Sequence, residues 1–170
     1  TVWALAFSRD GRLLATDGSD NLVFLHDVAQ GQIMAVLPMA NVVSAVAFSP
    51  DGATLACGPI DKVTLWDVAR RREFAAIRGL KGGAICLDFT PDGSTLAVSA
   101  ESQAPQLWDV RQVTAGGHVW KCESNGVQAL AISPDGRRLA VGEGDFYQPY
   151  KPSDINLRDL ASDREIGVFK

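Results

Sequence analysis

The chain has 170 residues, 46% of them hydrophobic and 21% charged, which is typical of a globular protein large enough to bury a core. Its formal net charge of -4 argues against the basic surface that binds nucleic acid, and it has no run of eighteen apolar residues that could span a bilayer. Three cysteines, Cys57, Cys86 and Cys122, show no CxxC spacing, so they predict neither a disulfide framework nor a metal site.

A ten-residue motif occurs four times along the chain. It reads FSRDGRLLAT, FSPDGATLAC, FTPDGSTLAV and ISPDGRRLAV, starting at residues 7, 48, 89 and 132, with steps of 41, 41 and 43 residues. Such a period is typical of four short strands per unit, stacked as the blades of a β-propeller. We therefore predict an all-β propeller segment of four four-stranded antiparallel blades, at about residues 1–40, 41–81, 82–125 and 126–170.

Each unit is expected to contain four strands in chain order. The first strands are predicted at 2–7, 42–48, 84–89 and 127–132, where the residues are almost continuously apolar, as in strands covered on both faces. Second strands follow each turn of the motif, and third strands end at residues 27, 67, 109 and 159. More polar fourth strands, typical of an outer edge, are predicted at 32–37, 73–79, 118–122 and 165–169.

A hairpin turn lies between the first and second strand of each unit. Its aspartate can hydrogen-bond the local backbone, and its glycine tolerates the positive φ that closes the turn. We assign these pairs a structural role in the repeat: Asp10 and Gly11, Asp51 and Gly52, Asp92 and Gly93, Asp135 and Gly136.

The third strands carry a second recurring motif, LHDV at 25–28, LWDV at 65–68, LWDV at 107–110 and LRDL at 157–160. With these motifs the chain resembles the WD-repeat β-propeller family over essentially its whole length. Trp66 with Asp67 and Trp108 with Asp109 are the intact copies. The resemblance implies a non-catalytic platform for protein assembly.

The repeats are degenerate, because the family's hydrogen-bonded tetrad of His, Ser or Thr, Asp and Trp is broken in every unit. The histidine position falls on Met39, Leu80 and Glu123. The indole N–H groups of the two tryptophans still need acceptors. We expect Asp61 to lie near Trp66, with no imidazole completing the relay.

No catalytic, cofactor or metal site is predicted. The two histidines, His26 and His118, have no partners at metal-ligand spacing, and we expect structural or surface roles for both. Asp88 is the one charged residue in a first strand, and alone it makes no active site. Two alternatives stay open: a sensor or regulatory propeller attached to a catalytic domain outside this chain, and an enzyme with its site in the propeller channel.

The fourth unit departs from the template between its second and third strands. From Asp135 to Asp159 there are 24 residues, where the other units have 17, 16 and 17. The extra residues include Phe146, Tyr147 and Tyr150, and aromatic side chains on a proline-containing loop are typical of binding hot spots. We predict a partner-binding loop here; the alternative is that these rings pack back over the blade rim.

We therefore expect a cytoplasmic scaffold for protein–protein interaction. The chain begins at Thr1, inside an apolar strand pattern, which suggests a segment of a larger or open propeller. The expected partners are other proteins or further propeller blades, with self-association through exposed blade faces, and neither nucleic acid nor a membrane.

Overall fold

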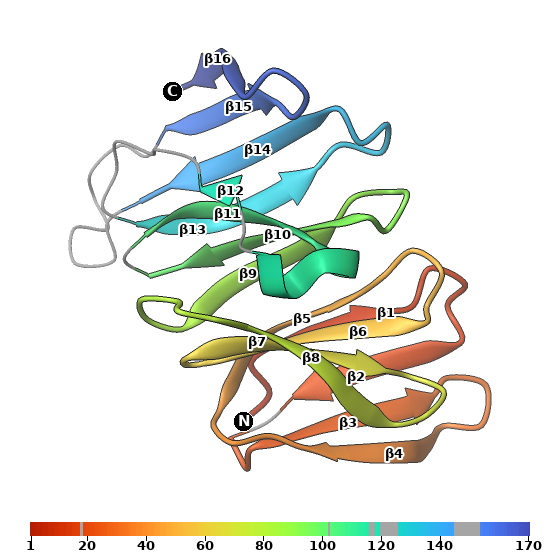
Figure 1. Ribbon diagram of the computed structural model, residues 1–170. Helices are drawn as coiled ribbons and strands as arrows, with labels where there is room; N and C mark the ends of the chain where they lie inside the picture. The colour runs from red at the N-terminus through yellow and green to blue at the C-terminus, as the bar shows by residue number, and fades with distance from the viewer. Residues whose placement is uncertain (18, 102, 116–117, 120–125, 145–153) are drawn as a thin grey trace. The chain divides into compact units, whose positions relative to one another are not determined.

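The computed structural model describes residues 1–17, 19–101, 103–115, 118–119, 126–144 and 154–170 (Figure 1). The chain divides into two compact units, Thr1–Ala84 and Ile85–Lys170, and each is described by itself. No helix among these residues is both long and apolar enough to cross a membrane.

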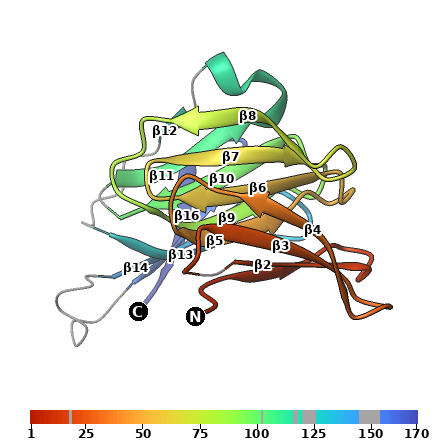
Figure 2. The ribbon, with the colours of Figure 1, turned by 90° about the horizontal axis from the view of Figure 1, so that it is seen from below.

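Unit 1 contains two antiparallel sheets in which each strand pairs with the next along the chain. The first, blade 1, consists of β1 (Leu5–Phe7), β2 (Leu13–Asp17), β3 (Leu22–Asp27) and β4 (Gln32–Pro38). The second, blade 2, consists of β5 (Val43–Phe48), β6 (Thr54–Pro59), β7 (Lys62–Asp67) and β8 (Arg72–Arg78). Figure 2 shows β6, β7 and β8 following one another across blade 2.

The strands assigned to unit 2 form two sheets of the same kind. Blade 3 consists of β9 (Ala84–Phe89), whose first residue closes unit 1, β10 (Thr95–Ala100), β11 (Gln103–Asp109) and β12 (His118–Val119), with the short 3₁₀ helix η1 (Val110–Ala115) after β11. Blade 4 consists of β13 (Val127–Ile132), β14 (Arg138–Glu143), β15 (Ile155–Asp159) and β16 (Arg164–Phe169). The predicted all-β fold of four four-stranded antiparallel sheets is confirmed.

One hydrogen-bonded turn closes the first hairpin of every blade. In blade 2 the Ser49 hydroxyl donates to Asp51 Oδ1 at 2.6 Å, the Ala53 N–H donates to the same oxygen at 3.0 Å, and Gly52 adopts a φ of 69°. The same bonds recur around Asp10, Asp92 and Asp135. The four copies of the motif thus fold into the same local structure because the turn is satisfied by its own residues.

A second recurring bond fixes the end of each third strand. The residue after the third-strand aspartate donates its N–H to the backbone of the first hairpin, as Val28 does to Arg12 O at 2.9 Å. Val68, Val110 and Leu160 repeat the bond with Ala53, Ser94 and Arg137. The aspartate itself accepts the N–H of the following turn, as in Asp67 with Arg70 at 2.7 Å.

Strand β1 is shorter than predicted, since it begins at Leu5 and not at Val2. The buried carboxylate of Asp17 accounts for the difference. Its Oδ1 accepts the N–H groups of Trp3 and Ala4 at 2.9 and 2.7 Å, so a side chain binds the N–H groups at this end, while the Asp17 N–H still donates to Ala4 O at 3.1 Å.

Apolar side chains from consecutive blades meet to form the core. In blades 1 and 3 we call the side turned toward the next blade of the unit the far face, and the opposite side the near face. In blades 2 and 4 the near face is the side turned toward the preceding blade of the unit, and the opposite side is the far face. In unit 1 the far face of blade 1 includes Ala15 and Leu25, and the near face of blade 2 includes Leu55 and Trp66; all four are buried in one cluster. Unit 2 repeats this arrangement, with Ala97 of blade 3 in one cluster with Leu139 of blade 4. The core therefore lies between sheets.

Candidate interaction surface

The aromatic loop predicted from the sequence lies outside the described residues. Phe146, Tyr147 and Tyr150 fall in the stretch 145–153, so their role stays a prediction. The described residues on either side of that stretch are hydrogen-bonded, since the Glu143 N–H donates to Asp154 O at 3.0 Å.

The tryptophans of the third strands take acceptors from their own strands. Trp66 is 7% exposed and donates its indole N–H to Thr64 Oγ1 at 3.1 Å; that Asp61 lies near Trp66 stays a prediction. Trp108 donates to Gln106 Oε1 at 2.9 Å. In both blades the acceptor lies two residues before the tryptophan, on the same face of the strand, because side chains alternate along a strand.

Apolar residues occupy two of the positions that carry histidine in the resembling family. Met39 packs against the core of unit 1, and its sulfur lies 3.8 Å from Thr64 Oγ1. Leu80 is buried. In blade 1, where His26 replaces the tryptophan, the imidazole Nε2 lies 2.9 Å from Thr16 Oγ1. Local pairs thus stand where the family has a four-residue relay.

Asp88 joins the first strands of the two blades of unit 2. Its Oδ2 accepts the N–H of Ile132 at 2.7 Å, and two residues earlier the Cys86 thiol lies 3.5 Å from Leu130 O. Partial burial raises the pKa of the Asp88 carboxyl above its ordinary value, although the hydrogen bond from Ile132 opposes that shift. Asp88 therefore contacts the first strand of the next blade, through the N–H of Ile132 in β13.

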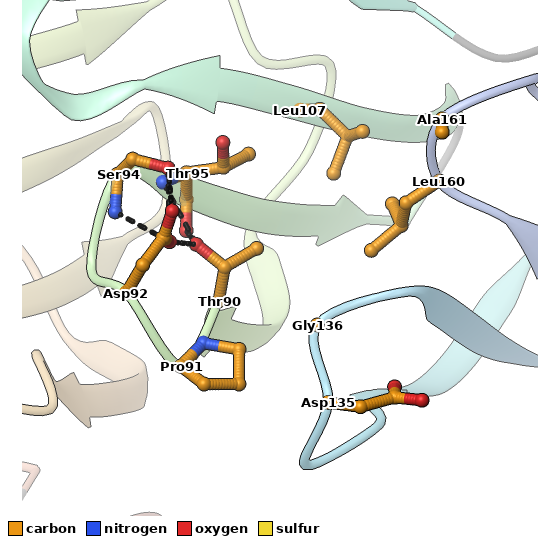
Figure 3. Close-up of a pocket in the computed structure, with 10 residues that line it drawn as sticks. All are labelled: Thr90, Pro91, Asp92, Ser94, Thr95, Leu107, Asp135, Gly136, Leu160 and Ala161. Carbon is orange, nitrogen blue, oxygen red and sulfur yellow. Dashed lines mark hydrogen bonds between the residues drawn. The ribbon is translucent and has the colours of Figure 1, made fainter.

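A cavity of about 410 Å³ lies within unit 2, beside the first hairpins of its two blades (Figure 3). Leu107, Leu160 and Pro91 supply apolar walls. Asp92 also lines the cavity, but its carboxylate is already bonded by Thr90 and Ser94, and these bonds lower its pKa to about 2. The Asp135 carboxylate is likewise bonded by Ser133. These carboxylates are occupied within their own turns.

Candidate catalytic and metal-binding chemistry is sparse in the part of the chain that the structure describes. There, no three His, Cys, Asp or Glu side chains gather where a metal ion could bind. Cys57 and Cys86 are free thiols, and burial raises the pKa of both. A buried, protonated thiol is a poor nucleophile.

A large apolar surface is exposed on the near face of blade 1. Trp3, Leu5 and Phe7 are 63%, 62% and 57% exposed. The repeat-equivalent residues of Leu5 and Phe7 in blade 2 are Val46, which is 9% exposed, and Phe48, which packs against the core. Sequence reasoning did not single out these residues, although aligning the four repeats position by position identifies them as core-type residues.

Four four-stranded antiparallel sheets, whose first hairpins share one pattern of hydrogen bonds, are typical of the blades of a β-propeller. Residues 1–27, 31–67 and 112–147 match the family model "WD domain, G-beta repeat", together more than half of the chain. The chain belongs to the WD-repeat family.

One solved structure with the same fold is that of Kuenenia stuttgartiensis hydrazine synthase. The identity is 21%, the TM-score is 0.86, and the match covers 98% of this chain and 48% of that chain. This chain thus spans about half the length of its structural neighbour, and at this identity the likeness shows the fold alone. No curated protein matches the sequence.

Removing the acceptor of a buried indole tests the local pairing in blade 2. We expect Thr64→Val to lower the free energy of unfolding by about 1–3 kcal/mol, because the Trp66 N–H stays buried without an acceptor. In a Trp66→Phe background the same change should cost less, and denaturant unfolding of the four proteins measures the coupling. Strictly additive effects would show that the bond does not contribute.

We expect the stability of unit 2 to depend on pH through the Asp88 carboxyl. Because its folded pKa is raised, its favourable contribution is complete below the unfolded pKa and is lost as the pH rises through the folded value. Asp88→Asn keeps an acceptor for the Ile132 N–H without the charge. Its stability relative to wild type should therefore increase as the pH rises from about 4 to 7.

Asp92→Asn is the matched control, because its stability relative to wild type should change with pH in the opposite direction. The Asp92 carboxylate has a folded pKa of about 2, so its stabilisation is present above the ordinary aspartate pKa of 3.8 and is lost as the pH falls toward 2. The stability of Asp92→Asn relative to wild type should therefore be lowest at neutral pH. Urea unfolding at several pH values distinguishes the two trends, and parallel curves for Asp88→Asn and wild type would contradict the assignment.

Proposed function

We propose that the chain is a non-catalytic scaffold that binds other proteins, as part of a larger propeller. WD repeats generally mediate protein–protein interaction, and the described blades hold their turns and strands through bonds repeated in every unit. We also propose that one blade ends and the next begins near residues 40, 81 and 125.

The observation that carries the proposal is the exposed row of Trp3, Leu5 and Phe7. Side chains of this size are seldom grouped on a surface that only meets water, and large exposed apolar patches mark interaction sites. Trp and Phe are also among the residues enriched at protein interfaces. The predicted loop with Phe146, Tyr147 and Tyr150 is a second proposed contact region, supported by the sequence.

The free thiols of Cys57 and Cys86 are compatible with the compartment that we propose, the cytoplasm. Disulfides are rare there because glutathione and thioredoxin keep thiols reduced.

Affinity capture with defined variants tests the proposed function. The chain serves as bait in three forms: wild type, Leu5→Ser with Phe7→Ser, and Phe146, Tyr147 and Tyr150 all changed to Ala. We expect each variant to lose partner proteins that wild type retains, because each removes apolar contact area.

Ile33→Ser with Phe74→Ser is the matched control, since both side chains are about half exposed on the outer strands β4 and β8. This control should capture the same proteins as wild type, and thermal unfolding checks that all forms are folded. If both test variants capture the same proteins as wild type, neither region is the binding surface.

A further inference from the structure

Within each unit, blades pack by one rule: large side chains on the near face of one blade meet small side chains on the far face of the blade before it. In unit 1, Val46 and Phe48 of β5 belong to the same cluster as Ala4 and Ala6, which precede or lie in β1. In unit 2, Leu130 and Ile132 of β13 cluster with Cys86 and Ala97 of blade 3. Small residues on one side let the large residues of the other approach closely.

Strand register shows which residues share each face. In blade 1, Ala6 pairs with Ala15 and Ala15 with Leu25, so these three lie on the far face. Phe7 pairs with Leu14, and both lie on the near face. The far face of blade 1 is therefore defined by Ala4, Ala6, Ala15 and Leu25, of which Ala15 and Leu25 are fully buried by blade 2.

The near face of blade 1 has no covering blade among the described residues of unit 1. Leu5, Phe7 and Val28 are 62%, 57% and 44% exposed. Their equivalents in blade 4 are Leu130, Ile132 and Leu160, which lie in or against the core cluster of unit 2. The exposed face is thus chemically the same as a face that is covered elsewhere in this chain.

The far face of blade 4 carries the same residues that the far face of blade 1 presents to the near face of blade 2. Ala131 pairs with Ala140, and Ala140 with Leu157, on the same side as Ala129. The residues at the four positions are identical to Ala4, Ala6, Ala15 and Leu25 of blade 1. Ala129 and Ala131 are exposed, although their equivalents Ala4 and Ala6 are half-buried against blade 2.

The far face of blade 3 differs from the far faces of blades 1 and 4 at two of these positions. Its far face has Cys86 and Asp88 where blades 1 and 4 have alanine, and Asp88 there accepts the Ile132 N–H. The far face of blade 4 carries no charged side chain at these four positions, so it can cover an apolar near face without leaving a buried charge unpaired.

Resting on the proposed scaffold function, we propose that the near face of blade 1 binds the far face of blade 4 of a second copy of this chain. The occupant follows from the matched residues, because the exposed near face repeats the one that covers Ala4, Ala6, Ala15 and Leu25 within unit 1. The contact joins two different surfaces, so it is heterologous. Two copies joined at both ends contain eight blades, which is within the range of closed propellers.

Sedimentation over a concentration series tests this proposal with the 170-residue chain. Wild type should shift from one-chain to two-chain mass as its concentration rises. Phe7→Glu alters only the near face of blade 1, and Ala131→Glu alters only the far face of blade 4. Each should need at least about ten-fold more protein to associate, because a charge would be buried in the contact.

Sedimentation of a mixture of the two variants is the decisive measurement. Phe7→Glu keeps an intact far face of blade 4, and Ala131→Glu keeps an intact near face of blade 1, so the mixture should form a pair through one intact contact. Phe74→Glu, at a half-exposed position on β8, and Ala69→Glu, at an exposed position after β7, are matched controls that should associate like wild type.

Three results would overturn the proposal: a wild type that stays at one-chain mass throughout, variants that associate like wild type, or a mixture that does not pair. If wild type stays at one-chain mass, the near face of blade 1 is not covered by a second copy, and a blade of another polypeptide is its remaining partner. The proposed scaffold function is tested separately by the variant with Phe146, Tyr147 and Tyr150 changed to Ala, because that variant alters none of the residues named on either face of this contact. Circular dichroism confirms that each variant retains its β structure.

Discussion

Each unit depends on the close packing of large side chains against an alanine-rich sheet face. Ala15 in blade 1 and Ala97 in blade 3 are fully buried beneath the following blade. Sheets pack about 10 Å apart, and extra methylenes in such a core force strain or backbone movement. The alanine at this position therefore sets how closely two blades of one unit approach.

Apolar packing also explains how this member of the WD-repeat family is held together without the usual tetrad. Met39 and Leu80 stand where histidines would be; Met39 packs against the apolar core of unit 1, and Leu80 is buried. Removing a whole polar network need not destabilise a core, whereas leaving one member unpaired does. Thr64 and Gln106 meet that requirement, since each accepts the indole N–H that the lost network would have bonded.

The features predictable from the sequence were those specified locally. The hairpins could be predicted because the aspartate, the glycine and the hydroxyl residue of each turn bond one another. The Asp17 carboxylate was missed, since it bonds the N–H groups of Trp3 and Ala4, which lie 14 and 13 residues before it in the chain. No acceptor for the Trp66 indole N–H was predicted from the sequence, although strand alternation already placed Thr64 on the same face. The exposed face of blade 1 needed the register to separate Leu5 and Phe7 from Ala4 and Ala6.

The packing claim is tested most directly by one substitution made at equivalent alanines. Ala15→Leu and Ala97→Leu place three extra carbons beneath a covering blade, whereas Ala140→Leu places them on the far face of blade 4, where Ala140 is half-buried. Denaturant unfolding is measured at concentrations where the chain is monomeric. The packing account predicts that the first two changes each lower the free energy of unfolding by about 1–3 kcal/mol and that Ala140→Leu changes it much less. Equal effects at all three positions would contradict the account.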